Sequence, residues 1–115
     1  MVKNSKTVVG LTEKVKLFSS NGRRKTLIAK VDTGASRSSL DMSLASELGL
    51  GPIIKSKIIK SAHGSRLRPI LEAELEIAGK RIKSEFTLAD RTHMKYRMLI
   101  GVNILKHRFI VDPSK

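Results

Sequence analysis

One run of residues indicates the topology of this chain most clearly: Ala29-Lys30-Val31-Asp32-Thr33-Gly34-Ala35-Ser36. In this run an apolar strand leads directly into an acidic residue and a glycine turn. A carboxylate at the end of a strand is held by a rigid element, and Gly34 lets backbone N–H groups approach it closely. Taken alone, the residues leave two interpretations open, a catalytic loop or an ordinary turn at the end of a strand.

Length and composition restrict the kind of protein that carries this run. The chain has 115 residues, of which 40% are hydrophobic, so we expect one domain with its own core. It contains no cysteine, which excludes disulfide scaffolds, thiolate zinc sites and cysteine nucleophiles. No apolar run reaches the roughly 18 residues of a membrane span, and residues 1–7 lack the apolar stretch of a signal peptide. We therefore expect a soluble, cytoplasmic protein without a membrane partner.

The chain is strongly basic, with 23 Lys and Arg against 10 Asp and Glu and a net charge of +13. Clustered basic residues favour nucleic-acid binding, but here they are dispersed, with one short run at Arg23-Arg24-Lys25. Three phenylalanines and one tyrosine are too few and too scattered for a platform on which bases stack. We therefore favour a basic, soluble surface over a nucleic-acid site.

Alternation of apolar and charged residues predicts two hairpins. In the first, a strand at Ile53–Lys60 leads into a turn and returns from Arg66, with its tip near Ala62, His63 and Gly64. The second turns at Ala78-Gly79-Lys80, and one face of it is apolar. That face comprises Leu71, Ala73, Leu75, Ile77, Ile82, Ser84, Phe86 and Leu88. Glutamates and lysines on the opposite face can lie across from one another.

The remaining elements are short. Strands are predicted at Val15–Phe18, Thr26–Val31 and Phe109–Val111. Asp41 can cap a helix that buries Leu44, Ala45 and Leu48 and ends at Gly49, and a second short helix fits residues 102–106. Strands with regular turns and little helix predict an all-β protein, a small closed β-barrel with one or two short helices.

Asp32-Thr33-Gly34-Ala35-Ser36 resembles the active-site motif of the retroviral-type aspartic proteases, the retropepsins. A second signature of that group consists of two apolar residues, a glycine, two variable positions and an apolar pair leading into a short helix, and it fits Leu99-Ile100-Gly101-Val102-Asn103-Ile104-Leu105. More specifically, residues 90–101 and 108–114 look like a small family once labelled putative ATP-dependent zinc proteases. Its members often neighbour ATP-grasp ligases that add glutamate to ribosomal proteins. The resemblance covers residues 9–114, which leaves 1–8 as an N-terminal extension.

The resemblance implies an aspartic endopeptidase that works as a homodimer. This chemistry needs two carboxylates within about 3 Å of each other that share one proton, and the chain has one Asp-Thr-Gly. A two-fold dimer would supply the second Asp32. The resemblance gives Thr33 a bracing role across the axis, lets Gly34 provide backbone room and places Ala35 and Ser36 along the cleft.

The resemblance further implies two flaps, tipped by Ala62, His63 and Gly64, that close over an extended peptide or protein substrate. The positive charge and the ligase neighbours suggest acidic segments as substrates. Neither a metal nor an organic cofactor is expected. Retroviral enzymes usually have Asp where this chain has Ser36 and Arg where it has Val102, so the ion pair that supports their dimers is missing here.

Two other functions remain open from the sequence. One is a peptide- or RNA-binding module on the same fold that does not cut its ligand. The other is a zinc protease, which would need metal ligands from among His63, His93 and His107. The chain has no His-Glu-x-x-His pattern, so we interpret these histidines as surface or hydrogen-bonded residues and expect no metal.

Overall fold

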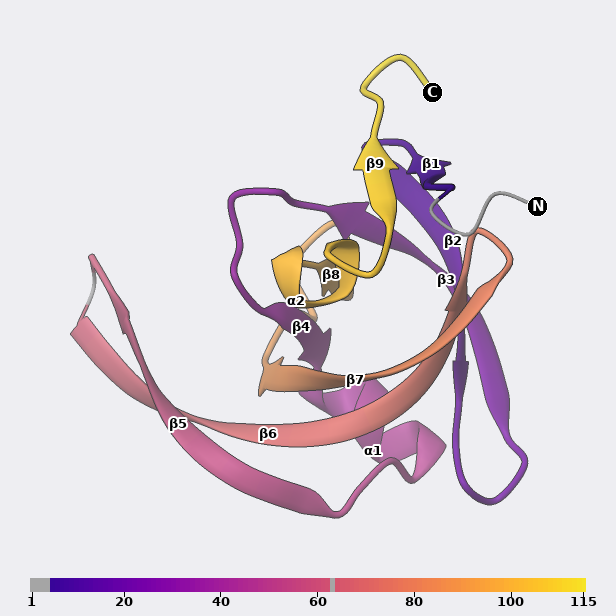
Figure 1. Cartoon of the computed structure of the whole chain (residues 1–115). Coiled ribbons are helices and arrows are strands. Elements are labelled where there is room, and N and C mark those ends of the chain that lie inside the picture. The colour runs from indigo at the N-terminus through magenta and orange to yellow at the C-terminus, as the bar shows by residue number, and fades with distance from the viewer. Residues whose placement is uncertain (1–4, 63) are drawn as a thin grey trace.

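The computed structural model describes residues 5–62 and 64–115, and strands make up most of it (Figure 1). The predicted tip residue His63 lies outside the described residues. In chain order the elements are β1 (Thr7–Val9), β2 (Thr12–Phe18), β3 (Arg24–Val31), β4 (Ser38–Asp41), α1 (Met42–Leu48), β5 (Ile53–Ser61), β6 (Gly64–Ile77), β7 (Lys80–Ala89), β8 (Met98–Ile100), α2 (Val102–Leu105) and β9 (Phe109–Val111).

Six of these strands close into a barrel. β2, β3, β8, β4, β7 and β6 are hydrogen-bonded in that order, and β6 pairs back with β2. The β3–β8 and β4–β7 pairs are parallel, whereas β2–β3, β4–β8 and β6–β7 are antiparallel. The predicted small closed β-barrel with two short helices is confirmed.

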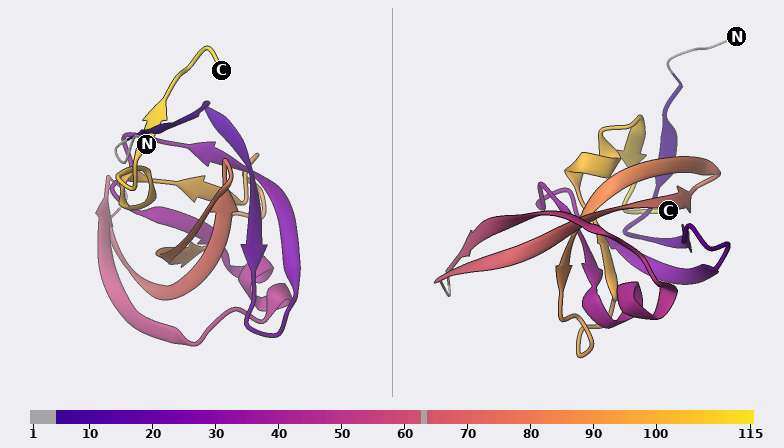
Figure 2. Two further views of the ribbon diagram at one scale, coloured as in Figure 1. Left: turned by 45° about the vertical axis from the view of Figure 1, so that its right-hand side comes forward. Right: turned by 90° about the horizontal axis from the view of Figure 1, so that it is seen from below.

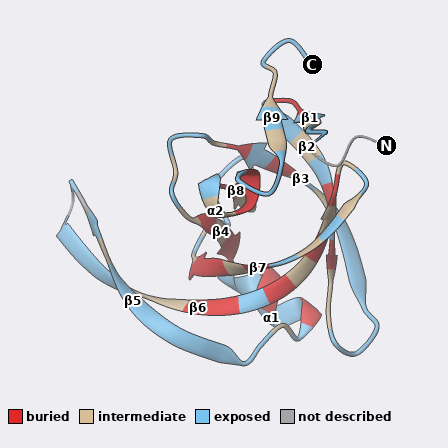
Figure 3. Ribbon diagram, viewed as in Figure 1, coloured by how far each residue is buried: buried red, intermediate tan, exposed pale blue. Residues whose placement is uncertain are grey.

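The two predicted hairpins are present, and they differ in burial. β6 and β7 pair in the register that sets Leu75 opposite Ile82 and Glu74 opposite Lys83, so the apolar face of the hairpin points into the core. β5 and the first half of β6 form a hairpin that extends away from the barrel (Figures 1 and 2). Buried residues gather in the barrel strands, while this extended hairpin is largely exposed (Figure 3).

The core fills the barrel with side chains from every wall. Its fully buried large members include Phe86, Leu17, Leu40, Leu44, Ile70, Leu71, Leu75, Ile77, Met98, Ile100 and Ile104. Alternation along the strands delivers most of these side chains to one face, as the period of two predicts. Leu44 and Ile104 come from α1 and α2.

The helix α1 forms as its sequence predicts. The Asp41 side chain accepts a hydrogen bond from the Leu44 N–H, and Gly49 ends the helix in a left-handed conformation with φ 66°. The buried face consists of Leu44, Ala45 and Leu48. This helix packs on the barrel beside β4 and β7, as Figure 1 shows from one side.

The two ends of the described chain meet in a small parallel sheet. β1 pairs with β9 so that Val8 lies opposite Ile110 and Val9 opposite Val111. The strand at 109–111 is confirmed, while the sequence patterns did not predict β1, which includes two residues of the expected extension. No helix in the described parts of the chain is long and apolar enough to span a membrane.

Candidate active site

Asp32 lies at the point where β3 leaves the barrel. Its backbone N–H donates to the Ile100 carbonyl at 2.9 Å, which ties the residue to β8. The carboxylate oxygen Oδ1 accepts the Gly34 N–H at 2.9 Å, and the Asp32 carbonyl accepts the Ala35 N–H at 3.3 Å. Asp32 is half-buried while Thr33, Gly34 and Ser36 are exposed, so the loop presents a fixed carboxylate at the surface of this single chain.

The second signature, residues 99–105, is hydrogen-bonded to the segment that follows Asp32. Gly101 donates its N–H to the Ser38 Oγ at 2.9 Å, and the Val102 N–H donates to the Ala35 carbonyl at 2.8 Å. A Cβ on Gly101 would lie 2.5 Å from the Arg37 carbonyl oxygen, closer than any side chain allows. Glycine is therefore required here so that α2 can begin directly against the loop. The preceding Leu99 and Ile100 belong to β8, and Ile100 is fully buried.

The Asn103 side chain is hydrogen-bonded to both β4 and β7. The sequence patterns did not identify this residue as part of the site. Its Oδ1 accepts from the Ser38 N–H at 2.9 Å and the Ser38 hydroxyl at 2.7 Å. Its Nδ2 donates to the Ser84 Oγ at 3.1 Å and the Glu85 carbonyl at 3.0 Å. One amide thus connects α2 with β4 and β7. The available signal was a polar residue in the apolar run 99–105.

A cleft of about 690 Å³ lies between the Asp32 loop and the β5–β6 hairpin. The loop contributes Gly34, Ala35 and Ser36, and the hairpin contributes residues 57–60 and Arg68. Ala62 and Gly64 are exposed at the described end of the hairpin and do not line the cleft. The structure therefore brings part of the predicted loop and part of the predicted hairpin to one space.

The charged side chains that line this cleft are mostly basic. Its charged members are Arg37, Lys57, Lys60, Arg68 and Arg91, with Asp90 as the acidic residue. The Asp90 carboxylate accepts hydrogen bonds from the backbone and hydroxyl of Thr92, which lower the pKa of Asp90. Several cations around one cleft raise the local concentration of an anionic ligand.

Asp41 anchors the loop that forms one wall of the cleft. The side chain of this residue is fully buried, and it accepts from the Arg91 N–H at 2.7 Å and from the Arg97 Nη2 at 2.6 Å. Burial alone would raise the pKa of Asp41, but hydrogen bonds from Ser43, Arg97 and the backbone hold that pKa far below its usual range. The prediction that Asp41 serves as a helix cap is confirmed, and the cap also fixes residues 91–97.

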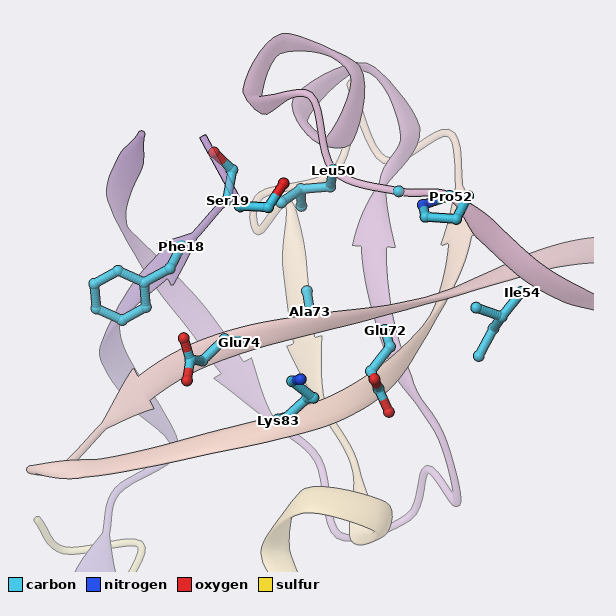
Figure 4. A pocket seen from close by; sticks show the side chains of 11 residues that line it. Phe18, Ser19, Leu50, Pro52, Ile54, Glu72, Ala73, Glu74 and Lys83 are labelled. Carbon is cyan, nitrogen blue, oxygen red and sulfur yellow. The ribbon is translucent and has the colours of Figure 1, made fainter. Parts of the chain in front are cut away.

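A separate cavity of about 320 Å³ lies outside the barrel, between the end of β2 and the segment that joins α1 to β5 (Figure 4). Phe18, Leu50 and Ile54 contribute apolar surface, and Glu72, Glu74 and Lys83 contribute charge. The lining includes none of the predicted site residues, so this cavity is not the candidate active site.

Metal ligands do not gather anywhere in residues 5–62 and 64–115: no group of three His, Cys, Asp or Glu side chains in them could hold an ion. His93 and His107 are both exposed, His93 in the loop before β8 and His107 after α2. The residues of the candidate site are thus a carboxylate, small loop residues and basic side chains.

A closed barrel with an Asp-Thr-Gly loop at the end of one strand, beside a long hairpin, defines the class of the retropepsin-like proteins. The structure is similar to the solution structure of the simian foamy virus protease, with a TM-score of 0.61 and 15% identity over 83% of this chain and 91% of that one. It is also similar to a crystal structure of a Legionella pneumophila protein of unknown function, with a TM-score of 0.65 and 22% identity over 96% of each chain. These likenesses show the fold.

The chain belongs to the RimB-like family, whose model is described as the retropepsin-like aspartic endopeptidase RimB and matches residues 44–115. This match confirms the resemblance found in the sequence. The matched residues contain the β5–β6 hairpin and the second signature, and Asp32 precedes them.

Curated relatives add a second kind of similarity. Proteins named probable alpha-L-glutamate ligase from Shewanella pealeana and Desulfotalea psychrophila are 33% and 36% identical to this chain over 64 residues. The matched region is 55% of this chain and 14% of each ligase. The chain therefore corresponds to a small part of those proteins.

Proposed function

We propose that two copies of this chain form an aspartic endopeptidase with one Asp32 from each copy. The observation that carries the proposal is the Asp32 carboxylate, held by the Gly34 N–H and braced by the second signature beside a basic cleft. Membership of a family described as retropepsin-like aspartic endopeptidases supports it. The dimer would work without a metal or an organic cofactor.

The proposed reaction needs the two carboxylates to share one proton, because two like charges so close together cannot both ionise. The ionised Asp32 takes a proton from a water molecule, whose oxygen attacks the carbonyl carbon of the peptide. The protonated Asp32 of the other copy donates its proton to the carbonyl oxygen. Collapse of the tetrahedral intermediate breaks the C–N bond, and the amine leaves with a proton returned by a carboxyl group.

The other predicted residues have positioning roles in this proposal. Thr33 braces the two loops across the dimer axis, and Ala35 and Ser36 line the cleft. The β5–β6 hairpin acts as a flap, with Ala62, His63 and Gly64 at its tip. An extended substrate lies beneath the hairpin and pairs with backbone groups as an added strand, so alternate side chains determine specificity.

We infer that the preferred substrates are acidic peptide segments. The cleft lining carries five basic side chains and one acidic one. The names of the ligase relatives include glutamate, which is consistent with an acidic substrate. Opposite charge increases the rate of encounter and disfavours basic competitors.

Cleavage of a diverse peptide library by wild type and by Asp32→Asn, at several protein concentrations between pH 3 and 8, tests the catalytic proposal. We expect every cut to disappear in Asp32→Asn, to survive a chelator and to rise more steeply than linearly with protein. Glu72→Gln is the matched control, because this exposed carboxylate lies on β6 and does not line the cleft. Cuts that persist in Asp32→Asn would refute the proposal.

The charge of the cleft is tested by Lys57→Glu with Arg68→Glu, two residues that face each other across the β5–β6 hairpin. For a glutamate-rich peptide we expect kcat/KM to fall about tenfold or more, with little change for a neutral peptide of equal length. Lys80→Glu with Lys106→Glu makes the same change in net charge outside the cleft. Equal losses for the acidic and the neutral peptide would refute the substrate class.

A second candidate function is a binding module on the same fold that does not cut. The exposed Ser36 and Val102, which stand where an ion pair supports viral dimers, favour this alternative, because a chain that stays monomeric has half a dyad. It predicts that Asp32→Asn binds the same peptides as wild type and that no cleavage occurs at any pH. A folded dimer that cuts would exclude it.

A further inference from the structure

One stretch of the barrel wall has an open strand edge. β3 pairs with β2 along its whole length, from Arg24 to Val31, but it pairs with β8 at Lys30 and Val31 alone. Within the described structure, residues 24–28 therefore have a neighbouring strand on one side. An edge of this kind presents unpaired N–H and C=O groups to an incoming chain.

The direction of the free backbone groups follows from two hydrogen bonds. The Val31 N–H donates to Leu11, on the β2 side, and the Asp32 N–H donates to Ile100, on the β8 side. Successive residues of a strand point their backbone groups to opposite sides. Thr26 and Ile28 have the same parity as Asp32, so their N–H and C=O groups face the open side.

A cavity of about 500 Å³ lies against this edge. Its apolar lining comes from Leu27 and Ile28 of β3, Leu44 of α1 and Tyr96 from the loop before β8. Leu44 is fully buried, and Ile28 is 46% exposed. The cavity thus has a core residue as its floor and an apolar rim that is large enough for one or two aliphatic side chains.

The charged residues at this cavity are all basic: Lys25, Lys95 and Arg97. Arg97 is occupied by the buried carboxylate of Asp41. Lys25 and Lys95 are exposed and have no ion-pair partner among the described residues, and the Lys95 Nζ lies 5.5 Å from the centre of the Tyr96 ring. Two cations therefore stand beside an apolar cavity and an open strand edge.

We propose that this site, formed by the free edge of β3 and the cavity beside Tyr96, is a second peptide-binding site that takes an acidic, extended segment. The segment pairs with Thr26 and Ile28 as an added strand, places an apolar side chain in the cavity and sets carboxylates against Lys25 and Lys95. Main-chain hydrogen bonds provide affinity in this mode of binding, and the pocket provides specificity.

The site is distinct from the catalytic cleft. The two cavities share no lining residue, although both use the loop before β8: Asp90, Arg91 and Met94 face the cleft, and Lys95, Tyr96 and Arg97 face the β3 edge. Occupation of the second site therefore does not require cleavage. One aromatic ring and a strand edge suit a peptide better than a nucleic acid, which would use several stacking rings.

Amide hydrogen exchange followed by NMR tests the site directly. The probe is an octapeptide of alternating glutamate and leucine, added to the Asp32→Asn variant so that it stays intact. We expect exchange at the Thr26 and Ile28 amides to slow by about tenfold or more at saturation, because these N–H groups gain acceptors. A peptide with every amide N-methylated should give no protection. Binding without slower exchange at Thr26 and Ile28 would overturn the proposal.

Charge reversal gives an independent test in Asp32→Asn protein that also carries Lys57→Glu and Arg68→Glu, which removes the attraction of the basic cleft for the peptide. Affinity is measured by anisotropy of the same peptide carrying fluorescein. Lys25→Glu with Lys95→Glu should weaken binding about tenfold or more, and Lys80→Glu with Lys106→Glu should change it less than about threefold. The proposal fails if the protein with the reversed cleft does not bind the peptide, or if adding Lys25→Glu with Lys95→Glu leaves its affinity unchanged. It also fails if a fluorescein-labelled single-stranded oligonucleotide binds at Lys25 and Lys95 and the peptide does not.

Discussion

At the scale of single residues, two aspartates show how position determines role. Asp32 leaves a strand into an exposed loop with one backbone donor on its carboxylate. Asp41 leaves the next strand into a helix and is surrounded by donors from Ser43, Leu44, Arg91 and Arg97. The first carboxylate stays accessible to a substrate, whereas the second is fully used in holding the fold.

Asp41→Asn is predicted to lower the free energy of unfolding by about 3 kcal/mol at neutral pH, because it leaves Arg97 beside an uncharged group. The folded-state pKa of Asp41 lies below its ordinary value of 3.8, so the charge stabilises the fold fully above that pH and loses its effect as pH falls below it. Urea unfolding followed by circular dichroism at pH 7, 5 and 3 measures this. The difference in unfolding free energy between wild type and Asp41→Asn should be constant from pH 7 to 5 and smaller at pH 3.

Asp112→Asn is the control for this prediction, because its exposed carboxylate accepts from Ser114 within the same turn. We expect a change within about 0.5 kcal/mol. A gap between wild type and Asp41→Asn that widens as pH falls would contradict the assigned role of Asp41.

Residue roles that depend on neighbours in sequence could be predicted, and those that depend on distant partners could not. Asp41 as a cap and Gly49 as a helix end follow from local chemistry. The Asn103 bonds to Ser38 and Ser84 join residues that are 65 and 19 positions apart, and no local pattern reports such a contact. The ion pair of Asp41 with Arg97 could not be predicted either, because these residues are also far apart in sequence.

At the scale of elements, the strands with a clear period of two were predictable and the short ones were not. The β6–β7 hairpin has seven consecutive alternating residues in each arm, which gives a strong signal. β1 and β4 have three and four residues and form because they pair with strands distant in sequence, β1 with the equally short β9 and β4 with the longer β7. Tertiary pairing, and not local propensity, makes such strands.

The β5–β6 hairpin provides the prediction at this scale. Ile58 and Leu67 lie directly opposite each other and are 62% and 68% exposed, so they contribute little to folding. Replacing both by Thr should change the free energy of unfolding by less than about 1 kcal/mol. If the hairpin is a flap, kcat/KM for peptides should fall about tenfold, because apolar contacts with the substrate are lost. Steady-state peptide cleavage and urea unfolding measure the two effects.

Ile53→Thr serves as the matched control, because Ile53 is 55% exposed at the base of the hairpin and does not line the cleft. Its cleavage rate should equal that of wild type. If the double variant also cleaves at the wild-type rate, the apolar pair has no part in binding substrate.

At the scale of the whole molecule, a single chain encloses its own core and carries one of the two aspartates that the proposed dyad needs. The pairing of β2 with both β3 and β6 closes the wall, so burial of the core does not need a partner. Catalysis by the proposed mechanism does, because each chain has one Asp-Thr-Gly. The many short strands with regular turns in the sequence predicted a closed barrel. No pattern in the sequence predicted which surface would join two barrels.

We propose that the outer face of the β1–β9 sheet joins two copies of the chain. Val8 and Ile110 face outward opposite each other and are 42% and 47% exposed, while Val9 is fully buried on the other face. The chain leaving β1 is bonded through Leu11 to Val31, the residue before Asp32. A two-fold axis that brings two Asp32 residues together would therefore pass close to this sheet.

Val8→Glu with Ile110→Glu is predicted to raise the dissociation constant of the dimer about tenfold or more, because burying four carboxylates near one axis is unfavourable. The unfolding free energy of the monomer should stay within about 1 kcal/mol of wild type, since both side chains are already exposed in the single chain. Sedimentation equilibrium measures association, and peptide cleavage as a function of concentration measures function. Because Asp32 is unchanged, activity should return at high protein concentration. Ile53→Glu, a comparable substitution away from the sheet, should leave association unchanged, and a Val8/Ile110 variant that dimerises like wild type would assign the interface to another surface.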